Sequence, residues 1–192
     1  SLAAEISPFE IDGASVTDDE QPGKAKVDRI PTLRPAFKSD GTITAANASS
    51  ISDGASALVL TRESNLNGRE PMARIVAHTT HSIHPSEFTL APIGAIEKLL
   101  EKTGWTADSV DLFEINEAFA MVTMLTMQAL NLSHDKVNIY GGACAQGHPI
   151  GSTGSRLIVT LAHALQQHDK QRGIAALCIG GGEATAVALE RA

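Results

Sequence analysis

Three short segments in the C-terminal part of the chain combine reactive side chains with backbone that a ligand can approach closely. Asn116 follows a short apolar run, His148 stands between Gly147 and Pro149, and Cys178 precedes three consecutive glycines. An amide, an imidazole, a thiol and a glycine-rich loop are the parts that thiol-assisted acyl transfer with oxyanion stabilisation needs. We therefore expect an acyl-transfer site that contains these side chains.

Each segment also has a plain structural interpretation. Asn116 could cap a helix that starts behind it. His148 could be an ordinary turn histidine, and Cys178 could be a buried cysteine before a β-turn. The occurrence of all three in one chain favours chemistry over these alternatives.

Strands that alternate with helices would have to position these side chains. Apolar spacing and turn residues predict strands at 72–77, 110–115, 137–140, 174–179 and 185–189, and helices at 92–102, 117–130 and 152–167. Residues 55–60 are small and apolar, and they predict a buried strand or helix end. The candidate side chains then lie at strand ends or strand-to-helix junctions, where α/β proteins place ligands. The closing pair of strands predicts a partly antiparallel sheet.

Residues 1–50 have a different character. Four prolines punctuate this stretch and no strong periodicity is present, so we expect a loop-rich appendage with one strand near 9–11. The chain begins with Ser1 rather than Met, which indicates a piece of a longer protein. Its first residues lack the basic leader and apolar core of a signal peptide.

Composition excludes several classes of protein. The chain has 192 residues, 43% of them hydrophobic, which is enough for a globular core. Its net charge of −7 argues against nucleic-acid binding, which needs a basic surface. No apolar run reaches the roughly 18–20 residues of a membrane span. Two cysteines predict no disulfide framework and fit a reducing, cytoplasmic location.

The three segments resemble the motifs of the thiolase family, in the same order and at similar separations. Asn-Glu-Ala-Phe-Ala at 116–120, Gly-His-Pro-Ile-Gly at 147–151 and Cys-Ile-Gly-Gly-Gly at 178–182 match the family's patterns. The flanking sequence at 33–37, 41–49 and 53–55 also resembles that of the family, so the resemblance covers nearly all of residues 30–192. The expected fold is α/β and thiolase-like, with a mixed five-stranded sheet and helices on both faces. Residues 1–50 would be a remnant of the family's loop domain and residues 51–192 its C-terminal domain.

The resemblance implies a role for each motif residue in reversible Claisen condensation and thiolysis of 3-ketoacyl-CoA. His148 would take the proton of a nucleophilic thiol, and an Asn116-bound water would help it hold the thioester oxyanion. Cys178 would be the acid and base at the α-carbon of the acetyl group. The Gly180 N–H would lie in a second oxyanion hole.

Residues implied to contact substrate come from two other places. Ala48 and Ser49 resemble the segment that touches the pantetheine arm of CoA. Phe88 stands where many family members have a Met that lines the acyl pocket, which leaves the acyl-chain preference open.

The resemblance also implies that a part is missing. Family members are about twice this length and carry their nucleophilic Cys in the N-terminal half. Neither Cys144, expected in packing, nor Cys178 matches that nucleophile. The chain would then be inactive alone, with the N-terminal half as partner and a homo-oligomer as the complete enzyme. Acetyl-CoA and acyl-CoA would be substrates, and no cofactor or metal is expected. A non-catalytic CoA-binding or structural subunit, paired with a separate N-terminal half, is the alternative.

Two further patterns are better explained by structure. His78, His81 and His84 repeat at three-residue spacing, yet no carboxylate or cysteine joins them at ligand spacing, so a solvated loop is expected. Met121 and Met124 on the predicted helix 117–130 are expected to pack in a core.

Overall fold

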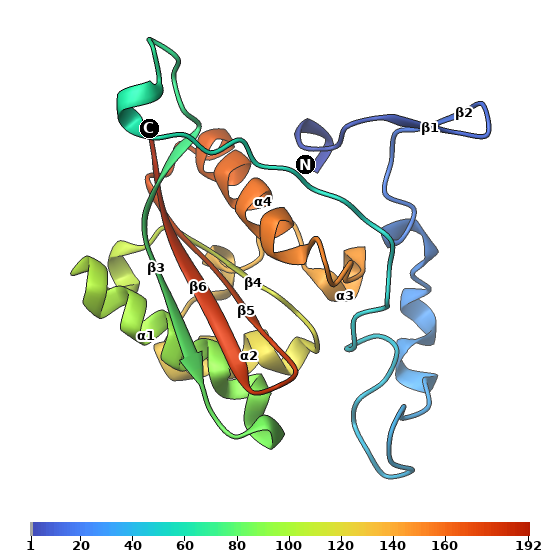
Figure 1. The fold of residues 1–192 in the computed structure, drawn as a ribbon. Coiled ribbons are helices and arrows are strands. Elements are labelled where there is room, and N and C mark those ends of the chain that lie inside the picture. Colours follow the sequence, from blue (N-terminus) through green and yellow to red (C-terminus); the bar gives the residue numbers. More distant parts are fainter. Residues whose placement is uncertain (1) are drawn as a thin grey trace.

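A four-stranded mixed sheet forms the centre of the computed structural model, which describes residues 2–192 (Figure 1). The strands are β3 (Ala73–Ser82), β6 (Glu183–Arg191), β5 (Arg172–Cys178) and β4 (Leu112–Ile115), in that spatial order. β6 runs antiparallel to both β3 and β5, whereas β4 and β5 are parallel. The predicted mixed α/β sheet is thus confirmed.

Helices cover both faces of this sheet, as predicted. α1 (Ala91–Thr103) and α2 (Ala120–Leu130) pack on one face, and α4 (Thr153–Gln167) packs on the other (Figure 1). Side chains alternate along the strands as the pleat requires: Phe113 and Ile115 of β4 point to the α1 side, and Leu112 points to α4. Two apolar layers therefore hold the strands in one register.

The remaining elements are short. α3 is the single turn Ala143–Gln146, and β1 (Phe9–Ile11) pairs with β2 (Ala14–Val16) as an antiparallel hairpin. The predicted strand 9–11 is confirmed, and the hairpin turns at Asp12-Gly13, where both residues have positive φ. Single 3₁₀ segments lie at Leu2–Ala4, Pro22–Lys24, Val27–Thr32, Glu63–Asn65, Pro85–Leu90, Ala107–Ser109 and His134–Lys136.

The predicted strand 137–140 is wrong, and so is the count of five strands. Val137 makes only an isolated parallel bridge to Phe113. The next residue, Asn138, has a φ of 48°, which ends any extended run. Its side chain takes the place of ladder bonds, because its Oδ1 accepts from the Ile115 N–H at 2.8 Å and its Nδ2 donates to the Ile115 carbonyl at 2.9 Å.

The predicted buried element at 55–60 is also wrong. This segment forms no helix or strand, and Val59 is 99% exposed. Its composition favours a strand, yet no strand among residues 2–192 pairs with it. A segment of this composition forms a strand only when a neighbouring strand pairs with it, and these residues have no such neighbour in the described part of the chain.

None of the helices in residues 2–192 has both the length and the apolar character that a membrane crossing needs.

Candidate active site

The ends of two parallel strands bring Asn116 and Cys178 to the same edge of the sheet. Ile115, the last residue of β4, is in register with Ala176 of β5, and the Asn116 N–H donates to the Ala176 carbonyl at 2.9 Å. Cys178 is the last residue of β5. The expectation that these residues lie at one sheet edge is therefore met, because parallel strands end on the same side.

His148 joins this edge through a side-chain contact. Its Nε2 lies 3.3 Å from the Asn116 Nδ2. Asn116 is completely buried, and its Oδ1 has no hydrogen-bond partner within residues 2–192. Asn116 does not cap a helix, because α2 begins at Ala120 with Phe119 as its N-cap residue. A buried amide oxygen without a partner is a place where a ligand or an ordered water is expected to bind.

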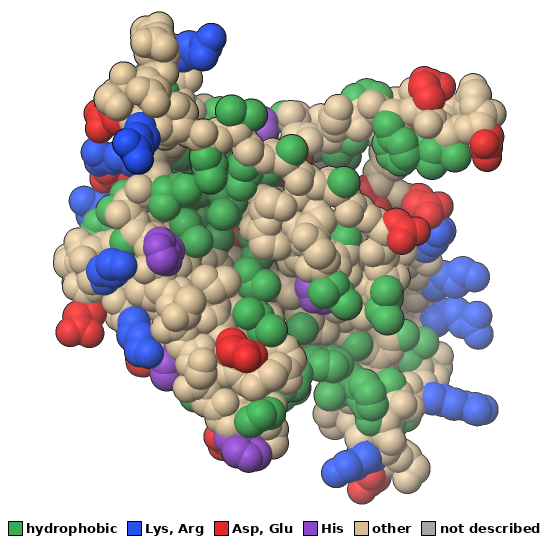
Figure 2. Space-filling view, viewed as in Figure 1, with side chains coloured by type: hydrophobic (Ala, Val, Ile, Leu, Met, Phe, Trp, Pro, Cys, Tyr) green, Lys and Arg blue, Asp and Glu red, His purple; other side chains and the backbone are tan. Residues whose placement is uncertain are grey.

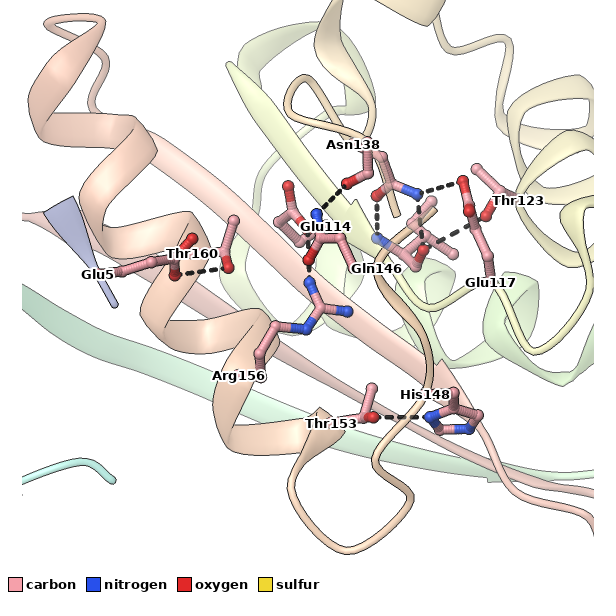
Figure 3. Close-up of polar contacts among 12 residues, drawn as sticks. Glu5, Glu114, Glu117, Thr123, Asn138, Gln146, His148, Thr153, Arg156 and Thr160 are labelled. Carbon is pink, nitrogen blue, oxygen red and sulfur yellow. Dashed lines mark hydrogen bonds and ion pairs between the residues drawn. The ribbon is translucent and has the colours of Figure 1, made fainter. Parts of the chain in front are cut away.

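The imidazole of His148 is held on its other side by Thr153. The His148 Nδ1 lies 2.6 Å from the Thr153 Oγ1 (Figure 3). Burial, with a smaller contribution from the Arg156 charge, lowers the pKa of His148 below its usual value. The ring is therefore neutral at pH 7 and can accept a proton.

A strap formed by residues 47–56 holds the Asn116 loop and the His148 loop together. The His148 N–H donates to the Ser50 carbonyl at 2.9 Å, and the Ala120 N–H donates to the Asn47 carbonyl at 2.9 Å. Gly147 has a φ of +88°, and a Cβ there would lie 2.1 Å from the Ser52 Oγ, so only glycine allows this approach. The predicted domain boundary between residues 50 and 51 falls inside the strap and stays a prediction.

Ala48 and Ser49 lie in the strap beside the Asn116 loop. Ala48 forms a bridge with Phe119, and both the N–H and the hydroxyl of Ser49 donate to the Ala118 carbonyl, at 3.2 and 3.0 Å. Phe88 reaches the same loop, with its ring edge-to-face to Phe119 at 6.4 Å between centroids. All three predicted substrate contacts therefore gather around the segment 116–120.

The thiol of Cys178 is buried at the strand end. Burial raises its pKa above the usual value, and a hydrogen bond to backbone offsets this only in part. The thiol is thus protonated at neutral pH, as an acid that returns a proton to carbon must be.

The glycine loop after Cys178 is a tight turn. The Gly182 N–H donates to the Ile179 carbonyl at 3.0 Å, and Gly182 has a φ of +99°. A Cβ on Gly182 would lie 2.3 Å from the Ile83 carbonyl oxygen, whereas a Cβ on Gly180 would meet nothing within 4 Å. Packing therefore explains Gly182, while Gly180 borders open space, as a backbone donor to a ligand would.

Comparisons with known proteins identify the family. Residues 69–191 match the family description "Thiolase, C-terminal domain", and residues 1–64 match "Thiolase, N-terminal domain". The chain belongs to the thiolase family. A probable acetyl-CoA acetyltransferase of Dictyostelium discoideum is 48% identical over 178 residues, which cover 92% of this chain and 43% of that protein.

Solved thiolase structures have the same fold. The acetyl-CoA acetyltransferase of Bacillus anthracis superposes with a TM-score of 0.91 at 39% identity, over 96% of this chain and 48% of that one. A thiolase of Ascaris suum in complex with coenzyme A gives a TM-score of 0.88 at 39% identity, over 100% and 50% of the two chains. The chain thus spans about half the length of the thiolases that it matches.

Glu117, in the first thiolase motif, is a supporting residue of the candidate site whose role its sequence position does not reveal. Its carboxylate accepts from the Cys144 N–H at 3.0 Å. It also accepts from the Asn138 Nδ2 at 3.1 Å, as Figure 3 shows. It also packs on Gly142, where a Cβ would lie 2.4 Å from the Glu117 Cδ. Glu117 therefore ties the Asn116 loop to the segment that leads to His148, and only its position directly after Asn116 could have pointed to it.

Cys144 lies against Glu117, and its thiol is poorly suited to act as a nucleophile. Burial first, and then the charge of Glu117, raise the pKa of this thiol to about 12. A thiol with such a pKa holds almost no thiolate at neutral pH. The structure therefore supports the expectation that Cys144 serves packing.

The expected solvated loop at His78, His81 and His84 is wrong for the first two histidines, which lie on a strand. Residues 2–192 contain no group of three or more His, Cys, Asp or Glu side chains placed to hold a metal ion. His78 and His81 lie on β3, and His81 packs closely on Gly94 of α1.

Met121 and Met124, expected in a core, are instead 40% and 65% exposed, because α2 turns this face outward.

A buried carboxyl and guanidinium lie behind the His148 loop. Glu114 of β4 is 2% exposed, and its Oε2 lies 3.7 Å from the Arg156 Nη1 of α4 without a hydrogen bond (Figure 3). At this separation the attraction only partly offsets desolvation, and burial raises the pKa of Glu114 to about 8. The carboxyl is therefore largely protonated at pH 7.

This raised pKa predicts a pH dependence of stability. Between the ordinary value of 4.5 and about 8, the folded chain holds a proton on Glu114 that the unfolded chain has released, so stability falls as pH rises through this window. Glu114→Gln should remove this pH-dependent contribution. As pH rises through the window, the free energy of unfolding of the variant should therefore increase relative to that of the parent, by at most about 1.4 kcal/mol per pH unit. The measurement is the free energy of unfolding by urea at pH 5, 6.5 and 8, with the exposed Glu101→Gln as control. Parallel curves for parent and Glu114→Gln would contradict the assignment.

Proposed function

We propose that this chain is the acid–base half of an acetyl-CoA C-acyltransferase. The complete enzyme would catalyse the reversible reaction of a 3-ketoacyl-CoA and CoA to an acyl-CoA and acetyl-CoA. The observation that carries the proposal is the arrangement of Asn116, His148 and Cys178 at the carboxyl edge of two parallel strands, with a 3.3 Å contact between the first two. This arrangement supports a site that would combine a neutral base, a thiol acid and a buried amide.

The first half-reaction would use His148. Its neutral imidazole would accept the proton of a nucleophilic cysteine thiol on the partner half, and the resulting thiolate would attack the keto carbon of the substrate. The bond between the α-carbon and this carbonyl would then break. A water held by the buried Asn116 Oδ1 would help to bind the thioester oxyanion.

The carbon centre would be served by Cys178. In cleavage, its thiol would protonate the α-carbon of the departing acetyl-CoA enolate. In condensation, its thiolate would remove a proton from the same carbon. The Gly180 N–H, next to open space, would hold the oxyanion of the acyl-enzyme. CoA would then take the acyl group from the partner's cysteine and regenerate its thiol.

Substrate contacts would come from the strap and the aromatic cluster. Ala48 and Ser49 would face the pantetheine arm of CoA, and Phe88 would line the acyl pocket. The solved Ascaris suum thiolase contains coenzyme A, which supports acyl-CoA substrates for this chain as well. No metal or bound organic cofactor is part of the proposal, because each proton transfer has a side chain to perform it.

An N-terminal thiolase half is the proposed partner. Leu58, Val59 and Leu60 of the extended segment are exposed by 37%, 99% and 69%, and further apolar side chains are exposed on the same face (Figure 2). A patch of this kind usually marks an interaction surface. Since residues 1–64 match the N-terminal domain of the family, we propose that the rest of that domain covers the segment and pairs with it.

Assembly and location are proposed from the family as well. We place the complete enzyme as a homo-oligomer in the cytoplasm, in fatty-acid or acetyl-CoA metabolism. A relative from Mus musculus, 45% identical over 171 residues, is named as cytosolic, which supports the location.

A hybrid enzyme tests the proposed function. This chain would replace the matching half of the Bacillus anthracis acetyl-CoA acetyltransferase, and thiolysis of acetoacetyl-CoA would be measured. We expect turnover, and we expect His148→Ala to lower it by about 10²-fold or more, since a general base is lost. His163→Ala, at a half-buried histidine of α4 ten positions after Thr153, is the matched control and should retain the rate. A folded hybrid that binds CoA but does not turn over would instead favour a non-catalytic subunit.

A further inference from the structure

Thr153 is a fully buried residue at the start of α4 and lies outside the three motifs. Its side chain touches two groups of the preceding loop. The Thr153 Oγ1 lies 2.6 Å from the His148 Nδ1 and 3.0 Å from the Pro149 carbonyl oxygen. Figure 3 shows the hydroxyl directed at the imidazole. A single hydroxyl therefore stands between the ring and a backbone acceptor.

The directions of these hydrogen bonds determine where the ring proton lies. The Asn116 Nδ2 can only donate, so the His148 Nε2 that it faces at 3.3 Å must offer a lone pair. In a neutral ring the proton then lies on Nδ1, which donates to the Thr153 Oγ1. The Thr153 hydroxyl in turn donates its own proton to the Pro149 carbonyl. Each of these three hydrogen bonds, from Asn116 through His148 and Thr153 to Pro149, therefore pairs a donor with an acceptor.

The opposite arrangement leaves a conflict. If the Asn116 oxygen faced the ring, the His148 Nε2 would carry the proton and Nδ1 would accept from Thr153. The Thr153 hydroxyl has one proton only, so its oxygen would then face the Pro149 carbonyl oxygen at 3.0 Å with no hydrogen between them. The first arrangement is therefore the favoured one.

We propose that Thr153 is a positioning residue that fixes His148 as the Nδ1–H tautomer, with the unprotonated Nε2 facing the Asn116 amide at the proposed site. The catalytic meaning of this role rests on the proposed function. A base can accept a thiol proton only through an unprotonated nitrogen, and Asn116 and Thr153 hold that nitrogen at the shared edge of β4 and β5. Thr153 thus acts on the reaction through His148 and touches no substrate.

The tautomer can be measured on this chain without any assay of activity. Two-bond ¹H–¹⁵N spectra of ¹⁵N-histidine-labelled protein distinguish the two neutral forms, and the His148 signals are assigned by their absence in His148→Gln. We expect the Nδ1–H form above the lowered pKa of His148. Thr153→Val should lose this preference, because it keeps the shape and removes the acceptor, whereas Thr153→Ser should keep it.

Thr160→Val is the matched control. Thr160 is also fully buried on α4, but its hydroxyl donates to Glu5 rather than to the site. It should leave the His148 spectrum unchanged. An Nε2–H form in the parent chain would overturn the proposal, as would an unchanged tautomer in Thr153→Val. If Thr153→Val does not fold, the parent spectrum and Thr153→Ala still decide.

A second readout separates this proposal from the proposed function. In the hybrid enzyme, Thr153→Val should lower kcat by about 10²-fold with KM little changed, and Thr153→Ser should restore it. A hybrid without any activity, combined with the Nδ1–H tautomer, would contradict the proposed function and leave the role of Thr153 intact. An active hybrid with the Nε2–H tautomer would support the proposed function and contradict the role of Thr153.

Discussion

Cys178→Ala in the hybrid enzyme is expected to stop carbon–carbon bond formation and to spare acyl transfer. Condensation of two acetyl-CoA molecules to acetoacetyl-CoA should fall by about 10²- to 10⁴-fold, the usual cost of losing a general acid or base. Acetyl transfer from acetyl-CoA to the partner's cysteine should stay close to the parent rate. The reason is that the proposed mechanism divides the proton transfers: His148 would serve the nucleophile and Cys178 would serve the α-carbon.

Two assays on one variant measure this separation. Release of CoA in the first turnover reports acylation, and formation of acetoacetyl-CoA reports condensation. Cys144→Ala is the matched control, because this second cysteine packs against Glu117 and should leave both rates unchanged. Equal losses in the two assays would show that Cys178 shapes the site rather than moves the proton. Full retention would return it to a buried cysteine at a strand end.

The 192-residue chain by itself is expected to show no thiolysis of acetoacetyl-CoA. Its two cysteines are Cys144, whose pKa is raised to about 12, and Cys178, whose pKa is also raised by burial. Both thiols are therefore protonated at neutral pH and poor nucleophiles. The measurement is the loss of acetoacetyl-CoA absorbance in the presence of CoA, with the hybrid enzyme as positive control. Turnover above about one per second would contradict the division into two halves.

Periodic segments could be predicted well from the sequence alone. The helix 92–102 is α1 within one residue at each end, because Pro92 starts it and Gly104, with a φ of 70°, ends it. Likewise 152–167 corresponds to α4, whose apolar side faces β4 and β5. These elements carry their own boundary signals and one apolar face.

The two wrong predictions of secondary structure, at 137–140 and 55–60, have one physical cause. Residues 137–140 have strand composition, but the positive φ of Asn138 and its side-chain bonds to Ile115 replace the strand ladder. Residues 55–60 are small and apolar, which predicts a buried strand or helix end, but nothing within residues 2–192 pairs with them. Strand propensity becomes a strand only beside a partner, and a sequence window does not contain the partner.

The site was predictable in its reactive residues but not in its supports. His148, Cys178 and Asn116 stand in motifs with glycines and a proline, which a reader can recognise. Thr153 lies outside these motifs, and Glu117 lies in one of them without any feature that predicts its contacts, because both side chains act through contacts between separate segments. Thr153 lies five positions after His148 and could be read as an ordinary first residue of a helix. Only the 2.6 Å contact between its Oγ1 and the His148 Nδ1 points to the role that we propose for it.

The location of the acetyl group after reaction with acetyl-CoA tests the central claim most directly. The hybrid enzyme would be treated with isotope-labelled acetyl-CoA, quenched in acid, digested and analysed by peptide mass spectrometry. We predict the label on the cysteine of the partner half, in both the parent hybrid and the Cys178→Ala variant, with none on Cys144 or Cys178. Label on Cys178, or its loss from the partner's cysteine in Cys178→Ala, would contradict the assignment of this chain as the acid–base half.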